Sequence, residues 1–242
     1  MGSTLCLDFG NTRQKYAFFS GDKLAEQGVL HEGEESLQAV IARLKPDYSI
    51  LSSVIDHSPA VEALLASHTR FHLLNSSSKL PFTTPVGKPS TIGADRLAIC
   101  AAAVSLFPGK NNLAIALGTC ITYNFISYRH EFLGGGISPG MDMRFRSLRD
   151  YTAKLPLVEE DWNFPLVGYD TETNITSGVI LGMAKEIDGF IDAYAARYDN
   201  FNVLLTGGNS GYFVPHLKNR IFADQDLIFK GLHAISAYNQ TA

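Results

Sequence analysis

The chain of 242 residues is 45% hydrophobic and 11% aromatic, which suffices for one large domain or two small domains with packed cores. Its net charge of -4 and its scattered Lys and Arg residues exclude an electrostatic basis for nucleic-acid binding. Its apolar runs are shorter than a membrane span and the N-terminus enters a predicted strand without a leader, so we expect a cytoplasmic protein with no membrane partner.

The first predicted elements are two apolar strands joined by a polar turn. Asp8 and Gly10 enter this turn, Asn11 and Thr12 form its tip, and Lys15 precedes the second apolar run. Consecutive turn N–H groups and the Thr12 hydroxyl suit phosphate oxygens, while Asp8 can hold a magnesium ion directly or through water. Lys15 can supply a positive charge to the same phosphates. The alternative is an ordinary hairpin in which Asn and Gly only make the turn.

The remaining elements of the first half complete a β-β-β-α-β-α-β order. Apolar spacing predicts, in turn, a strand over 23–28, a helix over 34–44, a strand over 49–54, a helix over 59–67 and a strand over 71–74. A Ser- and Pro-rich loop over 75–90 then leads to a helix over 93–106, which ends before Pro108 and Gly109.

The second half repeats this order with insertions. Its predicted elements are strands over 113–117, 121–126 and 131–133, a long helix over 175–198, a strand over 203–205, a short helix after Ser210, and a final strand near Ile221 or over 227–229. A second glycine turn, Gly118 and Thr119, lies between the first two of these strands. The repeat predicts two related halves, residues 1–109 and 110–242, that face one another across a nucleotide.

A glycine-rich run over residues 134–140 lies in the insertion of the second half. There the backbone must bend tightly or lie against a ligand, and Pro139 can start a helix that continues through Met143 and Leu148. The alternative is a structural loop without a ligand.

Six motifs, in this order and spacing, resemble those of the type III pantothenate kinases, a family of the actin and sugar-kinase superfamily. They occupy residues 8–12, 93–96, 118–122, 134–140, 152–156 and 205–208, so the resemblance covers the whole chain. The family includes a branch of Bvg accessory factors, which are accessory factors for transcription. The resemblance implies an α/β fold of two ribonuclease H-like domains, the actin-like ATPase fold.

The resemblance also implies an activity. Members of the family transfer the γ-phosphate of ATP to the primary hydroxyl of pantothenate, which gives 4'-phosphopantothenate in the first step toward coenzyme A. They need Mg²⁺ and a monovalent cation, K⁺ or NH₄⁺, and they are homodimers whose pantothenate site borrows residues from both subunits.

The family's substrate residues match four positions of this chain. Asp95 matches the general base, since a hydroxyl that attacks phosphorus must lose its proton and a carboxylate can accept it. Arg96 matches the residue that holds the pantothenate carboxylate, Gly93 belongs to the same motif, and Thr171 matches a threonine that reaches the partner's pantothenate site. Without the resemblance, Asp95 and Arg96 are also consistent with a solvated first helical turn.

The family's nucleotide-binding residues match the two polar turns and one pair of glycines. By the resemblance, Asp8 is the metal-associated carboxylate, and the contacts to ATP and its phosphates come from Gly10, Asn11, Thr12, Lys15, Gly118, Thr119, Gly207 and Gly208. Gly207 and Gly208 belong to the adenosine-side turn, although alone they are typical of any strand-to-helix connection.

Three positions depart from the family's pattern. Ala116 and Asn124 stand where the family has acids beside the second turn, and Val86 stands where it often has a tyrosine lining the pantothenate pocket. Charged groups in such positions can stabilise a transition state by about 3 kcal/mol. Asn124 keeps an oxygen for the monovalent cation but not its charge. Two alternatives therefore stay open: a catalytically impaired relative with a binding or regulatory role, and a kinase for another small hydroxylated substrate.

Overall fold

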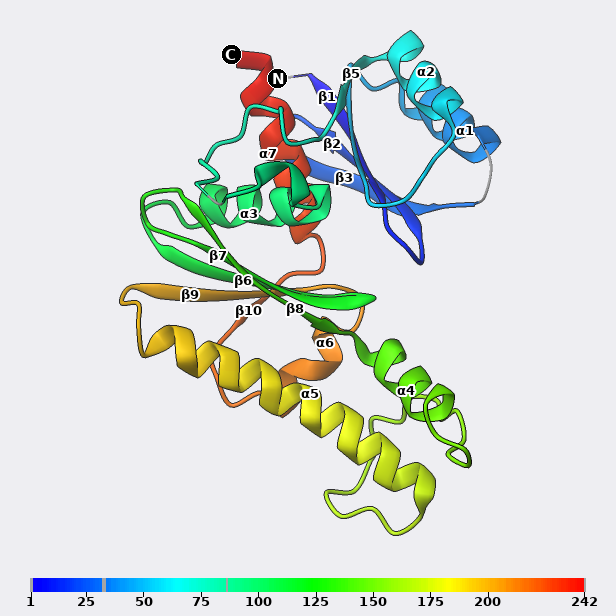
Figure 1. The fold of residues 1–242 in the computed structure, drawn as a ribbon. Helices are drawn as coiled ribbons and strands as arrows, with labels where there is room; N and C mark the ends of the chain where they lie inside the picture. Colours follow the sequence, from blue (N-terminus) through cyan, green and yellow to red (C-terminus); the bar gives the residue numbers. More distant parts are fainter. Residues whose placement is uncertain (1, 32–33, 86, 242) are drawn as a thin grey trace. The chain divides into compact units, whose positions relative to one another are not determined.

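The computed structural model describes residues 2–31, 34–85 and 87–241, which form two compact units (Figure 1). Unit 1 comprises Met1–Gly109, Ile126–Leu133 and Asp226–Ala242, and unit 2 comprises Lys110–Phe125 and Gly134–Gln225. The C-terminal segment therefore groups with unit 1, whereas the sequence analysis grouped it with the second half. Across the described residues, no helix has both the length and the apolar character needed to cross a membrane.

Unit 1 is built on a sheet of five described strands in the order β3-β2-β1-β4-β5. The strands are β1 (Ser3–Phe9), β2 (Gln14–Ser20), β3 (Lys23–Leu30), β4 (Tyr48–Ser53) and β5 (Arg70–Leu73). β1 pairs antiparallel with β2 and parallel with β4, so it is the central strand. This arrangement places the turn after β1 beside the end of β4.

Two pairs of helices cover the two faces of this sheet (Figure 1). On one face, α1 (Glu34–Leu44) and α2 (Pro59–His68) bury Leu37 and Leu65 against Leu7 of β1. Helices α3 (Ala94–Leu106) and α7 (Leu227–Thr241) lie on the other face, where the ring of His233 stacks on Phe19 of β2 at 4.3 Å. The short 3-10 helix η1 (Pro89–Thr91) precedes α3.

Close packing of α3 and α7 depends on small residues. A Cβ atom added to Gly231 of α7 would lie 1.8 Å from the carbonyl oxygen of Ala98 in α3. The α3 segment from Cys100 to Ala103 consists of small buried side chains. These small residues allow the backbones of α3 and α7 to pack closely. This packing sets the distance between α3 and the sheet.

Unit 2 contains a second sheet of five described strands in the order β10-β9-β6-β7-β8. They are β6 (Asn111–Leu117), β7 (Cys120–Ile126), β8 (Phe132–Pro139), β9 (Phe201–Thr206) and β10 (Phe222–Ala223). The long helix α5 (Thr171–Ala195) packs its buried face, including Ile180 and Ile187, against Ile115 and Tyr123 of the sheet (Figure 1). Shorter helices are α4 (Met141–Asp150), α6 (Ser210–Phe213) and the 3-10 turn η2 (Val214–His216).

Several predicted elements differ from those observed. The run over 227–229, predicted as a strand, begins helix α7, because Leu227, Leu232 and Ile235 continue an apolar helical spacing that three residues alone do not reveal. β10 is Phe222–Ala223. The glycine run, predicted to bend tightly or to lie against a ligand, forms most of strand β8, with positive φ angles of 101° at Gly134 and 154° at Gly135.

Two helix starts also differ. α4 begins at Met141 rather than Pro139, because Pro139 ends β8 and Gly140 is the N-cap. α5 begins four residues earlier than predicted, since Asp170 and Thr173 form a capping box at Thr171.

Candidate active site

The first polar turn, residues 10–13, joins β1 to β2 in unit 1. The N–H of Gly10 donates to the carbonyl oxygen of Arg13 at 3.2 Å, which closes the turn, and the side chains of Asn11 and Thr12 are exposed at its tip. The predicted strand–turn–strand is therefore present, with its polar tip accessible to a ligand.

A row of three polar side chains crosses the sheet just before this turn. Asp8 of β1 is paired directly with Lys15 of β2 and with Ser52 of β4. Side chains of directly paired residues project from the same face of a sheet. Leu7 and Leu51 pack in the core under α1 and α2, so alternation places the row on the face that carries α3 and α7.

A second carboxylate lies near Asp8 on this face. Asp95 sits in the first turn of α3, whose N-cap is Gly93. Burial and, next, the negative charge of Asp95 raise the pKa of Asp8 to about 7, against the opposing positive charge of Lys15. Burial likewise raises the pKa of Asp95, while the N–H and the positive charge of Arg96 lower it. Two such carboxylates in one place favour a bound cation.

The donor chemistry of this pair fits magnesium, which prefers carboxylate oxygens from one or two residues together with waters and substrate phosphates. Among the described residues no group of three or more His, Cys, Asp and Glu side chains gathers as a metal cage. Asp8, with Asp95 beside it, would therefore hold the ion together with waters and substrate phosphates, and not within a cage of protein ligands.

Gly93 and Arg96 shape the start of α3 around Asp95. A Cβ atom added to Gly93 would lie 2.5 Å from Oδ1 of Asp95 and 3.9 Å from Cγ1 of Val54, so the glycine lets the carboxylate fold back against the helix start. The guanidinium of Arg96 lies 5.5 Å from the centre of the Phe132 ring, a cation–π geometry. Val86, the third departure from the family pattern, lies outside the described residues.

The second polar turn joins β6 to β7 in unit 2. Gly118 and Thr119 are exposed, and the N–H of Gly118 donates to the carbonyl oxygen of Cys120 at 3.1 Å. Gly140 braces this turn, because a Cβ atom there would lie 2.3 Å from the Gly118 oxygen and 2.4 Å from the Thr119 oxygen. The last residue of the glycine run thus contacts the turn directly.

The Gly207–Gly208 pair follows β9 and contacts the end of β6. Gly207 has φ +104°, and a Cβ atom there would lie 2.1 Å from the carbonyl oxygen of Leu117. Its own carbonyl accepts hydrogen bonds from the N–H and Oγ of Ser210 at 3.1 and 2.8 Å. Gly207 therefore places the start of α6 beside the second polar turn.

We expect Gly207→Ala to destabilise unit 2 by several kcal/mol, about 3, and to weaken nucleotide binding, because the change adds both strain at positive φ and a clash with Leu117. Gly208→Ala is the matched control, since its Cβ would meet nothing within 4 Å. Denaturant unfolding of both variants is the measurement, and equal stabilities of the two variants would contradict this role.

The two replaced acidic positions lie in different settings. Ala116 is partly buried on β6 and is paired with Thr206 of β9. Asn124 of β7 is fully buried, and its Nδ2 donates to the carbonyl oxygen of Ala114 and to Oγ1 of Thr122, both at 3.1 Å. The Asn124 amide thus joins β7 to β6.

We expect Asn124→Asp to destabilise the protein by about 2–3 kcal/mol, because a carboxylate oxygen would replace the donor opposite the Ala114 carbonyl. Ala116→Asp serves as the comparison, since Ala116 makes no side-chain hydrogen bond that could be lost. Chemical denaturation at neutral pH measures the difference, and an Asn124→Asp variant as stable as wild type would contradict it.

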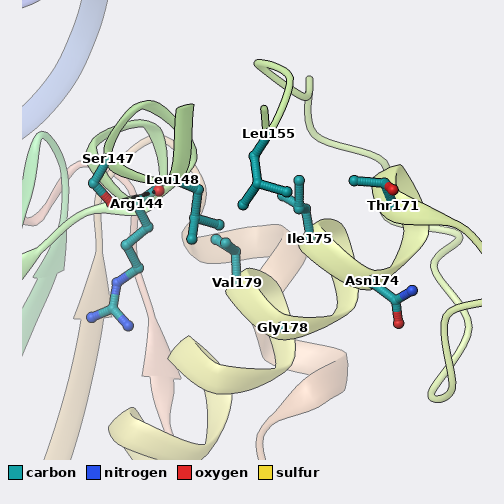
Figure 2. A pocket seen from close by; sticks show the side chains of 9 residues that line it. All are labelled: Arg144, Ser147, Leu148, Leu155, Thr171, Asn174, Ile175, Gly178 and Val179. Carbon is teal, nitrogen blue, oxygen red and sulfur yellow. Dashed lines mark hydrogen bonds between the residues drawn. The ribbon is translucent and has the colours of Figure 1, made fainter. Parts of the chain in front are cut away.

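Thr171, the first residue of α5, lines a pocket between α4 and α5 of about 650 Å³. Figure 2 shows the apolar side chains of Leu148, Leu155, Ile175 and Val179 gathered in it, with Arg144 at one end and Thr171 at the other. The structure therefore places Thr171 in unit 2, on an apolar surface of that unit.

Sequence reasoning did not single out two polar groups of these sites, the buried Ser52 and the partly buried Arg144. Ser52 completes the row beside Asp8, and its signal is a serine pair at the end of a predicted buried strand. Arg144 donates to Oγ of Ser138 at 2.9 Å and pairs with Glu186, which also accepts from the Tyr123 hydroxyl at 3.1 Å. No spacing in the sequence indicates this network, because its members come from four elements.

Each unit thus begins its sheet with two strands joined by an exposed polar turn. Unit 1 adds a pair of carboxylates, Asp8 of β1 and Asp95 in the first turn of α3. These features define a phosphotransferase of the actin-like ATPase fold, as predicted from the sequence. The family model described as type III pantothenate kinase matches residues 4–193. A type III pantothenate kinase from Cytophaga hutchinsonii is 43% identical over 235 residues, which cover 97% of this chain and 99% of the relative. The chain belongs to the type III pantothenate kinase family.

Solved structures agree on the fold. A protein from Campylobacter jejuni, described as a Baf family transcriptional activator, matches 98% of this chain and 100% of its own with a TM-score of 0.65 at 19% identity. An inorganic polyphosphate/ATP-glucomannokinase from Arthrobacter sp. strain KM matches 99% and 100% with a TM-score of 0.51 at 14% identity. At these identities the likeness shows the shared fold alone.

Proposed function

We infer that this protein transfers the γ-phosphate of ATP to the primary hydroxyl of pantothenate and so starts coenzyme A biosynthesis. The observation that carries this inference is the 43% identity, over nearly the whole of both chains, to a protein named type III pantothenate kinase. The carboxylate pair of unit 1 supplies the chemistry that such a transfer needs.

In the proposed reaction the hydroxyl oxygen attacks the γ-phosphorus as the bond to the β–γ bridging oxygen breaks, and ADP leaves. Asp95 accepts the hydroxyl proton, and the burial that raises its pKa makes it a stronger base than a solvated aspartate. Arg96, ordered against Phe132, binds the pantothenate carboxylate. Gly93 keeps room for the Asp95 side chain.

The phosphate contacts are proposed for the two polar turns. Gly10, Asn11 and Thr12 serve in unit 1, with Lys15 as the nearby positive charge. Gly118 and Thr119 serve in unit 2, and Gly207 and Gly208 hold the adenosine side. Asp8 is proposed to hold Mg²⁺, which when bound neutralises charge on the transferring phosphate.

The family resemblance implies a monovalent cation, K⁺ or NH₄⁺, in addition. Asn124 does not fit as its ligand, because its side chain is fully buried within the sheet, where two hydrogen bonds donated by Nδ2 hold it in place. We therefore propose that the reaction requires the monovalent cation but that Asn124 does not bind it.

We further propose a cytoplasmic location, where ATP is available. Recovery of the active protein from a membrane fraction would contradict it.

A coupled assay of ADP release tests the function. We expect release that depends on pantothenate and Mg²⁺, and that is faster with K⁺ or NH₄⁺ than with Na⁺. Release with a panel of small alcohols and sugars, but not with pantothenate, would contradict the proposed substrate. Nucleotide binding without any release would favour the catalytically impaired alternative that Ala116 and Asn124 leave open.

We propose that the α4–α5 surface pairs with a second copy of the chain. The pocket of Figure 2 is mostly apolar. Large hydrophobic side chains are also exposed on α4 and in the segment that joins α4 to α5: Met143, Tyr151, Leu157, Leu166, Val167 and Tyr169. Exposed apolar side chains of this kind mark interaction sites when they gather in one patch. Thr171 at the edge of this surface would then reach the partner's substrate site, as the family resemblance implies.

We expect light scattering to give twice the chain mass for the wild type and a lower average mass for Val167→Asp, because Val167 is 77% exposed on this surface. Leu106→Asp is the matched control, since Leu106 is 45% exposed at the end of α3 in unit 1. A wild-type monomer, or equal dissociation of both variants, would contradict the proposed interface.

A further inference from the structure

Ser52 is an unusual side chain within the carboxylate site of unit 1. It is fully buried at the end of β4, yet among the described residues its Oγ has no hydrogen-bond partner. Leaving a buried hydroxyl without a hydrogen-bond partner is unfavourable, so the position calls for a compensating role. Alanine would fill the same space without that cost.

The neighbours of Ser52 indicate what the hydroxyl serves. Ser52 is paired directly with Asp8 in a parallel register, which places their Cα atoms about 4.8 Å apart on the same face of the sheet. Val54, two residues later, lies against Gly93 at the start of α3. The hydroxyl therefore lies beside Asp8 on one face of the sheet, at the end of the strand whose next residues reach the start of α3.

We propose that Ser52 is a positioning residue, whose hydroxyl donates a hydrogen bond to the Asp8 carboxylate when that carboxylate holds the metal–nucleotide complex. A carboxylate with one oxygen held by a neighbour keeps its other oxygen aimed at the metal, and losing such a partner typically lowers metal affinity about tenfold or more. This inference rests on the proposed function of Asp8 and adds a residue to it. Lys15 lies on the opposite side of Asp8 in the same row, so the carboxylate is supported from both neighbouring strands.

The test compares Ser52→Ala, Ser52→Thr and wild type. Electron paramagnetic resonance of free Mn²⁺ measures binding of Mn²⁺ together with a non-hydrolysable ATP analogue, and steady-state assays measure the Mg²⁺ concentration for half-maximal rate. We expect Ser52→Ala to weaken Mn²⁺ binding and to raise the Mg²⁺ requirement about tenfold, with KM for pantothenate unchanged. Ser52→Thr keeps a hydroxyl and should recover most of the binding.

Ser49→Ala is the matched control. Ser49 is also fully buried in β4, but its Oγ bonds Oγ1 of Thr69 at 2.5 Å, three residues from the Asp8 row. Its loss should lower stability and leave Mn²⁺ binding as in wild type. If Ser52→Ala does not fold, Ser52→Cys keeps the volume with a weak donor and should show the same loss of binding.

Two results would overturn the proposal: Ser52→Ala binding Mn²⁺ as tightly as wild type, or Ser49→Ala losing as much affinity as Ser52→Ala. Because the resonance measurement needs no turnover, it separates this inference from the activity. A wild type that binds Mn²⁺ with the analogue but does not phosphorylate pantothenate would sink the proposed function while leaving the role of Ser52 supported.

Discussion

Asp95→Asn will lower kcat about 10²- to 10⁴-fold, the usual contribution of a positioned general base. The amide keeps the shape of the side chain in the first turn of α3 but has no basic oxygen for the hydroxyl proton. Binding of the ATP analogue should stay within a few-fold of wild type, because the proposed phosphate contacts lie in the two polar turns. Single-turnover kinetics and calorimetry measure the two properties separately.

Asp142→Asn is the matched control for this variant. Asp142 is likewise an acidic residue in the first turn of a helix, α4, and it is exposed. Both substitutions remove one charge from a helix N-terminus, so both should have a similar, small effect on helix stability. Turnover near the wild-type level in Asp95→Asn would show that another group accepts the proton.

Asp8→Asn will abolish Mg²⁺-dependent turnover and yet stabilise the metal-free protein at high pH. The carboxyl ionises near pH 3.9 in an unfolded chain and at about 7 in the folded one. Between these values the unfolded state has released a proton that the folded state still holds, so wild-type stability falls as the pH rises and the loss is complete above pH 7. Asparagine removes this penalty, which is on the order of 2–4 kcal/mol at its upper limit.

Denaturant unfolding without metal, at pH 5 and at pH 8, checks this sign. The advantage of Asp8→Asn over wild type should grow with pH. Asp47→Asn should instead lose the same stability at both pH values, because hydrogen bonds from Ser3 lower the pKa of Asp47 and its carboxylate is already ionised at pH 5. An advantage of Asp8→Asn that is independent of pH would mean that Asp8 is not held in a buried, carboxylate-rich site.

Elements with a strong local signal were predictable from the sequence. Helix α1 has the predicted bounds, because Leu37, Val40 and Ile41 form a helical stripe that ends before Pro46. The strand–turn–strand around Asp8 was also predictable, since an apolar run, a glycine and a polar tip coincide within ten residues. The family motifs then assigned functions to positions about which the apolar spacing gives no information.

Other features depend on tertiary packing and had no local signal. Helix α7 was missed because its first three residues are consistent with a strand, and only contact with α3 through Gly231 shows why the helix is placed there. The glycine run was predicted to bend tightly or to lie against a ligand, although it forms a paired strand that tolerates Gly134 and Gly135 at positive φ. The Ser52–Asp8 pairing depends on strand register, which no single segment encodes.

The most direct test of the account is to identify the product of the wild-type reaction. Purified protein, ATP, pantothenate, Mg²⁺ and K⁺ should give ADP and a pantothenate monoester whose phosphorus NMR signal is coupled to the protons of the primary carbinol. A phosphate ester at that oxygen, formed far more slowly by Asp95→Asn, is the predicted result. ADP formed without any phosphorylated pantothenate would contradict the account and direct attention to another acceptor.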